Sequence, residues 1–262
     1  MTDIDRDLVR PEAYPPPRPG AVELRETHVS WAFLTEADVY KVKKPVSLGF
    51  LDFATLEARQ RACEAEVVLN ERLAAGVYLG VKPVRLGADG RACLHGDGPV
   101  VDWAVHMLRL PDAARADVLL ERGELTTRDI DRIAEHLAAF HGRATSDVRT
   151  AEHGALEAIV SAVLENFEST RDASSERVTR EEAREIERWQ LGFLQQHADR
   201  FDARRRDGFV RDVHGDLRLE HVYLANEGIT ILDCIEFADR FRCCDTACDL
   251  AFLSMDLAAH GR

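Results

Sequence analysis

The chain of 262 residues lacks the features that would place it at a membrane or on nucleic acid. No apolar run approaches the length of a membrane-spanning helix, so no membrane contact is expected. The acidic start, Met1 to Asp5, lacks the apolar stretch of a signal peptide, which makes the cytoplasm the expected location. Because the net charge is −13 and no basic stripe is present, nucleic acid is not an expected partner.

Lysine is scarce, with four lysines against thirty arginines. Three of the four lie within four positions, at Lys41, Lys43 and Lys44. Since arginine supplies nearly all other positive charge, this cluster indicates that a compact ammonium group is needed there. A solvated strand edge, where lysine is also favoured, is the alternative interpretation.

The six cysteines show no metal-binding spacing. Cys243, Cys244 and Cys248 lie close together, but adjacent cysteines followed by a gap of three match neither a zinc ribbon nor a zinc finger. In a cytoplasmic chain they are expected to stay reduced and to act as small buried hydrophobic residues.

The order of the expected elements predicts two lobes of different class. Residues 1–20 are proline-rich and predict an extended lead-in. Residues 21–106 combine strand-like runs with a helical period over residues 53–73, which predicts an N-lobe of sheet and helix. Residues 107–262 read as a mainly helical C-lobe. The expected fold class is therefore α+β, with an antiparallel-sheet N-lobe.

The individual elements follow from the apolar periodicity. Strands are expected at residues 22–24, 28–34, 39–46, 81–86, 91–94, 100–110, 210–213, 222–224 and 229–232. Helices are expected at residues 126–144, within 151–200 and from Asp245 onward, and the first of these has Thr126 or Thr127 as its candidate cap.

The segment around His214-Gly215-Asp216 precedes a predicted hairpin that brings acidic residues together. The residues from 225 to 228 predict a hairpin loop, with Leu224 opposite Ile229. This register puts Leu232 opposite His221 and Asp233 opposite Glu220, so two acidic side chains and an imidazole gather at the open end of the hairpin, next to the Asp216 loop. Carboxylates at such a mouth suit magnesium and a triphosphate.

A second His-Gly-Asp run begins at His95. It is interpreted as a turn, because Gly98 follows Asp97 at once between two expected strands and these residue types favour turns.

Three further segments carry a family resemblance, and they begin at Thr27 (Thr-His-Val-Ser-Trp), Tyr40 (Tyr-Lys-Val-Lys-Lys-Pro) and Cys234 (Cys-Ile-Glu-Phe). With the Asp216 loop, they resemble the aminoglycoside phosphotransferases, a family with a protein-kinase-like fold. The more specific likeness is to a bacterial branch that is sometimes fused to a P-loop kinase domain, which makes such a domain a candidate partner. The resemblance implies that ATP donates its γ-phosphate to a hydroxyl of a small molecule.

The catalytic and metal-binding roles of that family transfer to the second half of the chain. Asp216 is the expected catalytic base, and His214 and Gly215 shape its loop. Asp233 is an expected magnesium ligand, and Glu236 is a candidate additional ligand. His221 stands where the family usually has an asparagine ligand, and imidazole would favour manganese over magnesium.

The nucleotide-binding roles transfer to the first half. One of Lys41 and Lys43 should contact the phosphates, and Lys41 is favoured. Glu66 is its expected partner, with Glu64 as the competitor. Neither a GxGxxG fingerprint nor a Walker motif is present, which argues against a P-loop enzyme or a dinucleotide-binding fold. Ser30 and nearby backbone would therefore cover the phosphates. The expected hinge against adenine contains His106, Met107 and Leu108.

Two departures from the family leave a second function open. One is His221, and the other is the end of the chain at Arg262, which implies a truncated chain or a minimal substrate pocket. The alternative to an enzyme is a nucleotide-binding pseudokinase that acts as a regulatory module or fusion partner.

Overall fold

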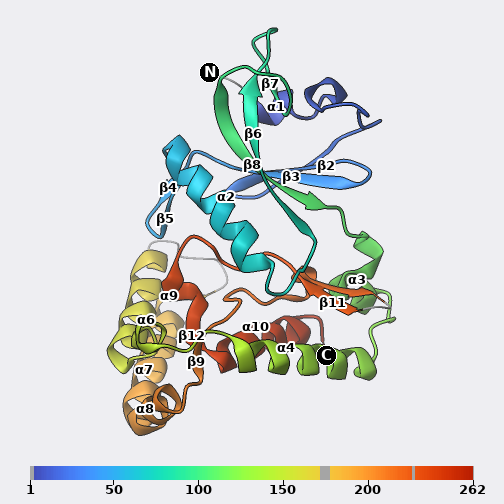
Figure 1. Ribbon diagram of the computed structural model, residues 1–262. Coiled ribbons are helices and arrows are strands. Elements are labelled where there is room, and N and C mark those ends of the chain that lie inside the picture. The colour runs from blue at the N-terminus through green and yellow to red at the C-terminus, as the bar shows by residue number, and fades with distance from the viewer. Residues whose placement is uncertain (1–2, 172–177, 226–227, 262) are drawn as a thin grey trace. The chain divides into compact units, whose positions relative to one another are not determined.

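The computed structural model forms two compact units (Figure 1). The described residues are 3–171, 178–225 and 228–261. Unit 1 contains Met1–Phe140 and Arg218–Ala238, and unit 2 contains His141–Leu217 and Asp239–Arg262. This division differs from the predicted lobe boundary after residue 106, which falls inside strand β8 (Val100–Leu108).

Unit 1 is built on a six-stranded antiparallel sheet with the order β1-β2-β3-β8-β6-β7. Its other strands are β1 (Glu23–Glu26), β2 (Ser30–Leu34), β3 (Asp38–Lys43), β6 (Tyr78–Leu86) and β7 (Ala92–Cys93). Each covers part of an expected strand. A short hairpin of β4 (Ser47–Leu48) and β5 (Leu51–Asp52) precedes the helix and was not predicted.

Helix α2 (Leu56–Asn70) lies along one face of this sheet (Figure 1). It begins where the Thr55 hydroxyl accepts a hydrogen bond from the backbone N–H of Ala58, which satisfies one of the terminal donors. Near its start, the Arg59 guanidinium donates to both carboxylate oxygens of the buried Asp102 on β8. A buried ion pair and apolar contacts thus fix the helix to the sheet.

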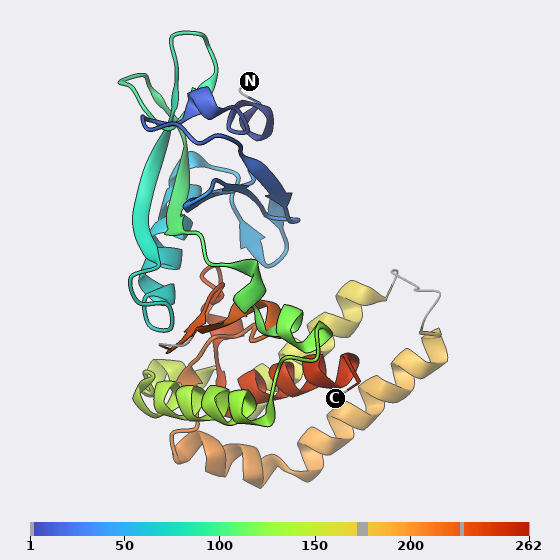
Figure 2. The same cartoon turned by 90° about the vertical axis from the view of Figure 1, so that its right-hand side faces the viewer.

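The N-terminal segment is folded, so the expected extended lead-in is wrong for part of residues 1–20. Helix α1 (Ile4–Asp7) and the 3-10 turn η1 (Pro11–Ala13) lie beside the sheet, in dark blue in Figure 2. Four residues of the segment are buried in a core with strands β2, β3, β6 and β8, namely Ile4, Leu8, Ala13 and Tyr14. The apolar spacing of four between Ile4 and Leu8 explains this, because it places both side chains on one helical face.

The rest of unit 1 carries the hairpin predicted around Asp233. The 3-10 turn η3 (Leu219–His221) leads into β10 (Val222–Ala225), which pairs with β11 (Gly228–Ile231). The register pairs Leu224 with Ile229, as predicted. Asn226 and Glu227 of the expected loop lie outside the described residues. Three other elements of unit 1 are η2 (Asp112–Ala114), α3 (Ala116–Glu121) and most of α4 (Thr127–Arg143).

Unit 2 is mainly helical. Its helices are α5 (Val148–Glu152), α6 (Leu156–Thr170), α7 (Arg180–Gln196), α8 (Ala198–Arg206), α9 (Asp239–Arg242) and α10 (Thr246–Ala259). Strands β9 (Val210–Asp212) and β12 (Cys243–Asp245) form a short antiparallel pair. Residues 172–177 of the expected helical stretch lie outside the described residues. Helix α4 begins at its predicted cap, where the Thr126 hydroxyl accepts from the N–H of Asp129.

The observed elements confirm the predicted α+β fold class. An antiparallel sheet with a single long helix comes first in the chain, and a mainly helical region follows. Among the described residues, no helix combines the length and the apolar character that crossing a membrane requires. All six cysteines are free thiols, and Cys243 is buried as expected, whereas Cys248 is exposed.

Candidate active site

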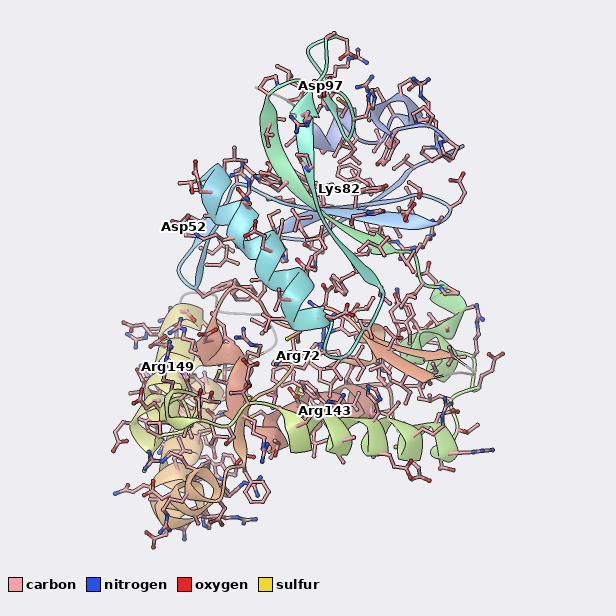
Figure 3. The ribbon with its side chains drawn as sticks, in the orientation of Figure 1. Asp52, Arg72, Lys82, Asp97, Arg143 and Arg149 are labelled. Atoms are coloured by element: carbon pink, nitrogen blue, oxygen red, sulfur yellow. The ribbon has the colours of Figure 1, made fainter. Side chains whose placement is uncertain are left out.

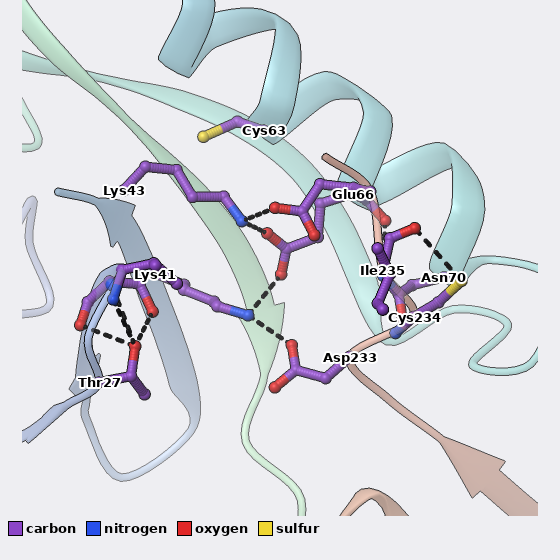
Figure 4. Close-up of polar contacts among 12 residues, drawn as sticks. Thr27, Lys41, Lys43, Cys63, Glu66, Asn70, Asp233, Cys234 and Ile235 are labelled. Carbon is purple, nitrogen blue, oxygen red and sulfur yellow. Dashed lines mark hydrogen bonds and ion pairs between the residues drawn. The ribbon is translucent and has the colours of Figure 1, made fainter. Parts of the chain in front are cut away.

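Strand β3 directs two lysines toward helix α2. Lys41 and Lys43 lie two positions apart, so the alternation of a strand puts both side chains on one side of the sheet. Both ammonium groups contact Glu66, which is fully buried on α2 (Figure 4). Lys41 Nζ lies 3.0 Å from Glu66 Oε1, so the pair suggested by the sequence is present. The competing Glu64 is exposed and accepts a hydrogen bond from Gln60.

The two lysines differ in their second partner and in their exposure. Lys43 also contacts Glu236, and only 2% of its side chain is exposed. Lys41 also contacts Asp233, and 17% of its side chain is exposed. The Asp233 side chain is 43% exposed, so the Lys41–Asp233 end of the network reaches solvent. The Lys43 end of the network is buried away from solvent.

Burial disfavours each charge of this network, but the neighbouring opposite charges outweigh it. Burial lowers the pKa of Lys41, yet the carboxylates of Asp233 and Glu66 raise it well above its usual value. Burial raises the pKa of Glu66, and the two lysines bring it below its usual value. Asp233 follows the same pattern, because Lys41 and His221 lower a pKa that burial raises. The network is therefore ionised at neutral pH.

Asp233 occupies an unusual backbone conformation. Its φ is 63°, in the left-handed region that costs free energy for a residue with a side chain, although aspartate tolerates it better than most. The ion pair with Lys41 and a hydrogen bond from the Asp233 N–H to the Tyr78 hydroxyl (3.4 Å) hold it there. Strain at an exposed, charged side chain suggests a functional constraint.

The candidate metal ligands have protein partners in this structure. Glu236 contacts Lys43, and its role as a metal ligand stays a prediction. The carbonyl of His221 accepts a hydrogen bond from the Leu232 N–H at 3.0 Å, which fixes its backbone in the predicted hairpin register. Across residues 3–171, 178–225 and 228–261, no three or more His, Cys, Asp or Glu side chains are grouped to hold a metal ion.

The His214-Gly215-Asp216 loop is built in unit 2 around a buried carboxylate. Asp249 on α10 accepts hydrogen bonds from the N–H groups of His214 (3.1 Å) and Gly215 (2.9 Å). His141 Nε2 lies 2.9 Å from the same carboxylate. His214 is buried, and its Nδ1 accepts from the Asp216 N–H at 3.2 Å. His214 therefore shapes the loop as expected, and Asp249 anchors its backbone.

We expect Asp249→Asn to lower the free energy of unfolding by about 1.5–3 kcal/mol at neutral pH, because three donors lose a charged acceptor. Burial raises the pKa of Asp249, but His141 and the loop amides bring it below its usual value. The stabilisation by the carboxylate is then complete above the unfolded-state pKa of about 3.9, and is lost as pH falls toward the lower folded-state pKa.

Denaturant unfolding at neutral and at acid pH measures this difference. Asp207→Asn, at an exposed position of the same unit, serves as the matched control and should leave stability within about 0.5 kcal/mol. Equal stability of wild type and Asp249→Asn at neutral pH would show that the carboxylate does not hold the loop.

The second His-Gly-Asp run is the turn that the sequence predicts. His95, Gly96 and Asp97 lie in the connection between β7 and β8, and Gly96 has a φ of 81°. Figure 3 shows Asp97 at one end of the sheet of unit 1 and Arg72, at the end of α2, toward the other. The Arg72 guanidinium contacts Cys234, the residue after Asp233, so Arg72 marks the end of the sheet near the Lys41 network. The second His-Gly-Asp run therefore lies away from that network.

The expected nucleotide site also contains Ser30, Met107 and Leu108. Ser30 is buried, and its hydroxyl lies 2.9 Å from the hydroxyl of Thr27, so it stabilises a turn at the start of β2. Met107 is buried against α2, whereas Leu108 is 42% exposed at the end of β8. Their contacts with a nucleotide stay a prediction.

Sequence analysis did not identify Asn70, a fully buried residue at the end of α2 whose side chain contacts Cys234. A spacing of four from Glu66 puts both on one helix face, and an amide among apolar positions was the available signal. Tyr78 was missed because its role depends on a contact with Asp233 far along the chain.

Comparison with known proteins gives relatives of unestablished function. No family model matches the chain. It is 34% identical over 251 residues to uncharacterized proteins of Mycobacterium tuberculosis and Mycobacterium bovis, covering 96% of this chain and 49% of each of those proteins. The chain therefore spans about half the length of the curated relatives it matches.

Solved structures with similar folds include two small-molecule kinases. A choline kinase from Cryptosporidium parvum Iowa II matches with a TM-score of 0.44 and 11% identity, over 83% of this chain and 60% of that one. A glucosamine kinase in complex with glucosamine, ADP and inorganic phosphate matches with a TM-score of 0.35 and 19% identity, over 93% of this chain and 57% of that one.

Proposed function

We propose that this chain is a phosphotransferase that moves the γ-phosphate of ATP to a hydroxyl of a small molecule. The observation that supports this most is the network in which Lys41 contacts both Glu66 and Asp233. A lysine held between a buried helix glutamate and a partly exposed aspartate is the arrangement that protein-kinase-like enzymes use for phosphates and metal.

Lys41 is the phosphate-binding lysine in this proposal, and Lys43 is structural. Lys43 is enclosed between Glu66 and Glu236, and its side chain is almost fully buried. Lys41 is the more exposed lysine, and its second partner is the aspartate that reaches solvent. An incoming phosphate can therefore replace Asp233 as the partner of Lys41 without opening the buried end of the network.

The residues fit a magnesium ion bound together with a nucleotide. Magnesium in kinases is held by one or two protein carboxylates plus phosphate oxygens, so a cluster of three protein ligands is not required. Asp233 offers an ionised, partly exposed carboxylate, and His221 lies close enough to influence its charge. When bound, the ion would neutralise charge that develops on the phosphates.

Asp216 is the proposed base. The proton of the acceptor hydroxyl passes to its carboxylate while the hydroxyl oxygen bonds to the γ-phosphorus and the bond to the ADP oxygen breaks. The contacts from Asp249 and His214 hold the backbone around Asp216, so its carboxylate is presented from a fixed loop.

The direct test is incubation of the chain with γ-labelled ATP, magnesium and a panel of sugars, amino alcohols and other small alcohols. Transfer of label to one compound would establish the reaction class. ATP binding without transfer to any compound or to water would favour the pseudokinase. Absence of ATP binding with either magnesium or manganese would overturn the proposal. A P-loop kinase domain as partner stays a prediction. The longer relatives could be examined for such a domain.

We expect His221 to shift the metal preference. Imidazole nitrogen suits manganese better than magnesium, so ATP should bind more tightly with manganese, and His221→Asn should reverse this order. Calorimetry with both ions measures this preference in the wild type and in His221→Asn. Equal metal preference in the two proteins would show that His221 takes no part.

A further inference from the structure

We propose that Asn70 is a positioning residue that holds Asp233 in register with the Lys41–Glu66 pair. This inference rests on the proposed function, because it assigns Asn70 a role in metal-dependent ATP binding. Lys41 contacts two carboxylates from distant parts of the chain, Glu66 on α2 and Asp233 after β11. Some contact must fix the distance between these two segments for both carboxylates to meet one ammonium group.

The side chain of Asn70 makes that contact from both ends of its amide. Its Nδ2 donates to the backbone carbonyl of Glu66 at 2.9 Å, and its Oδ1 accepts from the N–H of Cys234 at 3.0 Å (Figure 4). Cys234 follows Asp233 directly, so one buried side chain joins the backbone of Glu66 to the backbone beside Asp233. Asn70 is fully buried, so no water competes for either bond.

Neighbouring contacts support the same junction, but they start from residues beyond the end of helix α2. The Ile231 N–H donates to the Leu73 carbonyl at 3.1 Å, and the Arg72 guanidinium lies 3.2 Å from the Cys234 sulfur. Both come from residues that follow α2. Asn70 differs because it lies on the helix itself, one turn after Glu66, so its side chain links the helix that carries Glu66 to the Asp233 segment.

A purely local role at the end of α2 explains only half of these contacts. An asparagine that served the helix alone would need its bond to the Glu66 carbonyl, but not the bond from Cys234. The N–H that makes the second bond belongs to Cys234, the residue directly after Asp233. Asp233 has a left-handed backbone conformation, which is strained and needs contacts from elsewhere in the chain to persist. Without Asn70, Asp233 can relax and its carboxylate leaves the position that serves the metal.

The test is the magnesium concentration that gives half-maximal ATP binding, measured by calorimetry at saturating ATP. Asn70→Leu keeps the size of the side chain and removes both hydrogen bonds. We expect the magnesium midpoint to rise about tenfold. This factor corresponds to the loss of one buried hydrogen bond, the one from Cys234 that joins helix α2 to the Asp233 segment. A variant that only unfolds more easily would lose binding amplitude and keep its midpoint, so the two effects are separable. Asn166→Leu, at an exposed asparagine of α6, is the matched control and should change neither.

Asn70→Asp keeps the test decisive where Asn70→Leu does not fold. Its protonated carboxyl can donate to the Glu66 carbonyl and accept from Cys234, as the amide does, whereas its ionised form cannot donate. Burial favours the neutral form. The ratio of the variant midpoint to the wild-type midpoint should therefore fall toward one as pH is lowered, whereas the ratio for Asn70→Leu should stay high.

Three results separate this inference from the proposed function. Raised midpoints in both variants, with rescue of the aspartate variant at acid pH, would establish the positioning role. Midpoints equal to wild type would overturn it and leave the proposed function standing. A wild-type chain that binds no ATP with magnesium or manganese would overturn the proposed function, and the positioning role would fall with it.

Discussion

Asp216→Asn should abolish phosphate transfer while ATP still binds within a few-fold of the wild-type affinity. A general base contributes about 10²–10⁴ in rate, and asparagine has the shape of aspartate but cannot accept the proton of the acceptor hydroxyl. The loop should persist in this variant, because Asp249 holds it through the N–H groups of His214 and Gly215 and not through the Asp216 side chain. Single-turnover transfer and calorimetry measure the two quantities separately.

The chain provides its own control for this experiment. Asp97 occupies the same place in a second His-Gly-Asp run, is exposed, and lies in a turn. Asp97→Asn should therefore leave both transfer and binding unchanged. Turnover on an identified substrate that survives Asp216→Asn would show that Asp216 is not the base and that the motif match is incidental.

Asp233→Ala should remove metal-dependent ATP binding, the second large effect. The change deletes the partly exposed carboxylate proposed to hold the ion, and Lys41 keeps its contact with Glu66. Loss of this proposed metal ligand should raise the dissociation constant by at least about a hundredfold, the equivalent of roughly 2.7 kcal/mol. Calorimetric titration with ATP in excess magnesium gives the measurement.

A second substitution separates the lost carboxylate from a changed backbone. Alanine is disfavoured at the φ of 63° that Asp233 adopts, whereas asparagine tolerates this region. Asp233→Asn should therefore keep the backbone and still lose metal-dependent binding. Asp131→Ala, at an exposed position of α4 in the same unit, should bind as wild type does. Unchanged binding in both Asp233 variants would remove this residue from the site.

The chemistry proposed for this chain depends on an asymmetry between two similar lysines. Lys41 and Lys43 share a strand, a direction and a glutamate partner. Glu236 neutralises the buried Lys43. The more exposed Lys41 can therefore exchange its partner Asp233 for a phosphate. A buried charge is costly unless it is paired, so Glu236 has a structural reason for its position that needs no metal.

Local patterns in the sequence predicted much of the fold. Alternation and turn residues placed the strands of the sheet and the register of Leu224 with Ile229, because both depend on neighbours along the chain. The cap at Thr126 followed from the same kind of local signal. The N-terminal segment was predicted incorrectly, because its prolines suggested an extended chain while its few apolar residues found a core supplied by distant strands.

The sequence by itself determined the fold class, the shared direction of Lys41 and Lys43, and the hairpin that carries Asp233. Only the tertiary structure decided which lysine is enclosed, which carboxylate each one meets, and how Asn70 joins α2 to the Asp233 segment. Lys41 and Asp233 are 192 positions apart, and Lys43 and Glu236 are 193 apart. Propensity and periodicity act over a few residues, whereas the burial that gives a charge its partner is set by packing between segments that the sequence does not show to be neighbours.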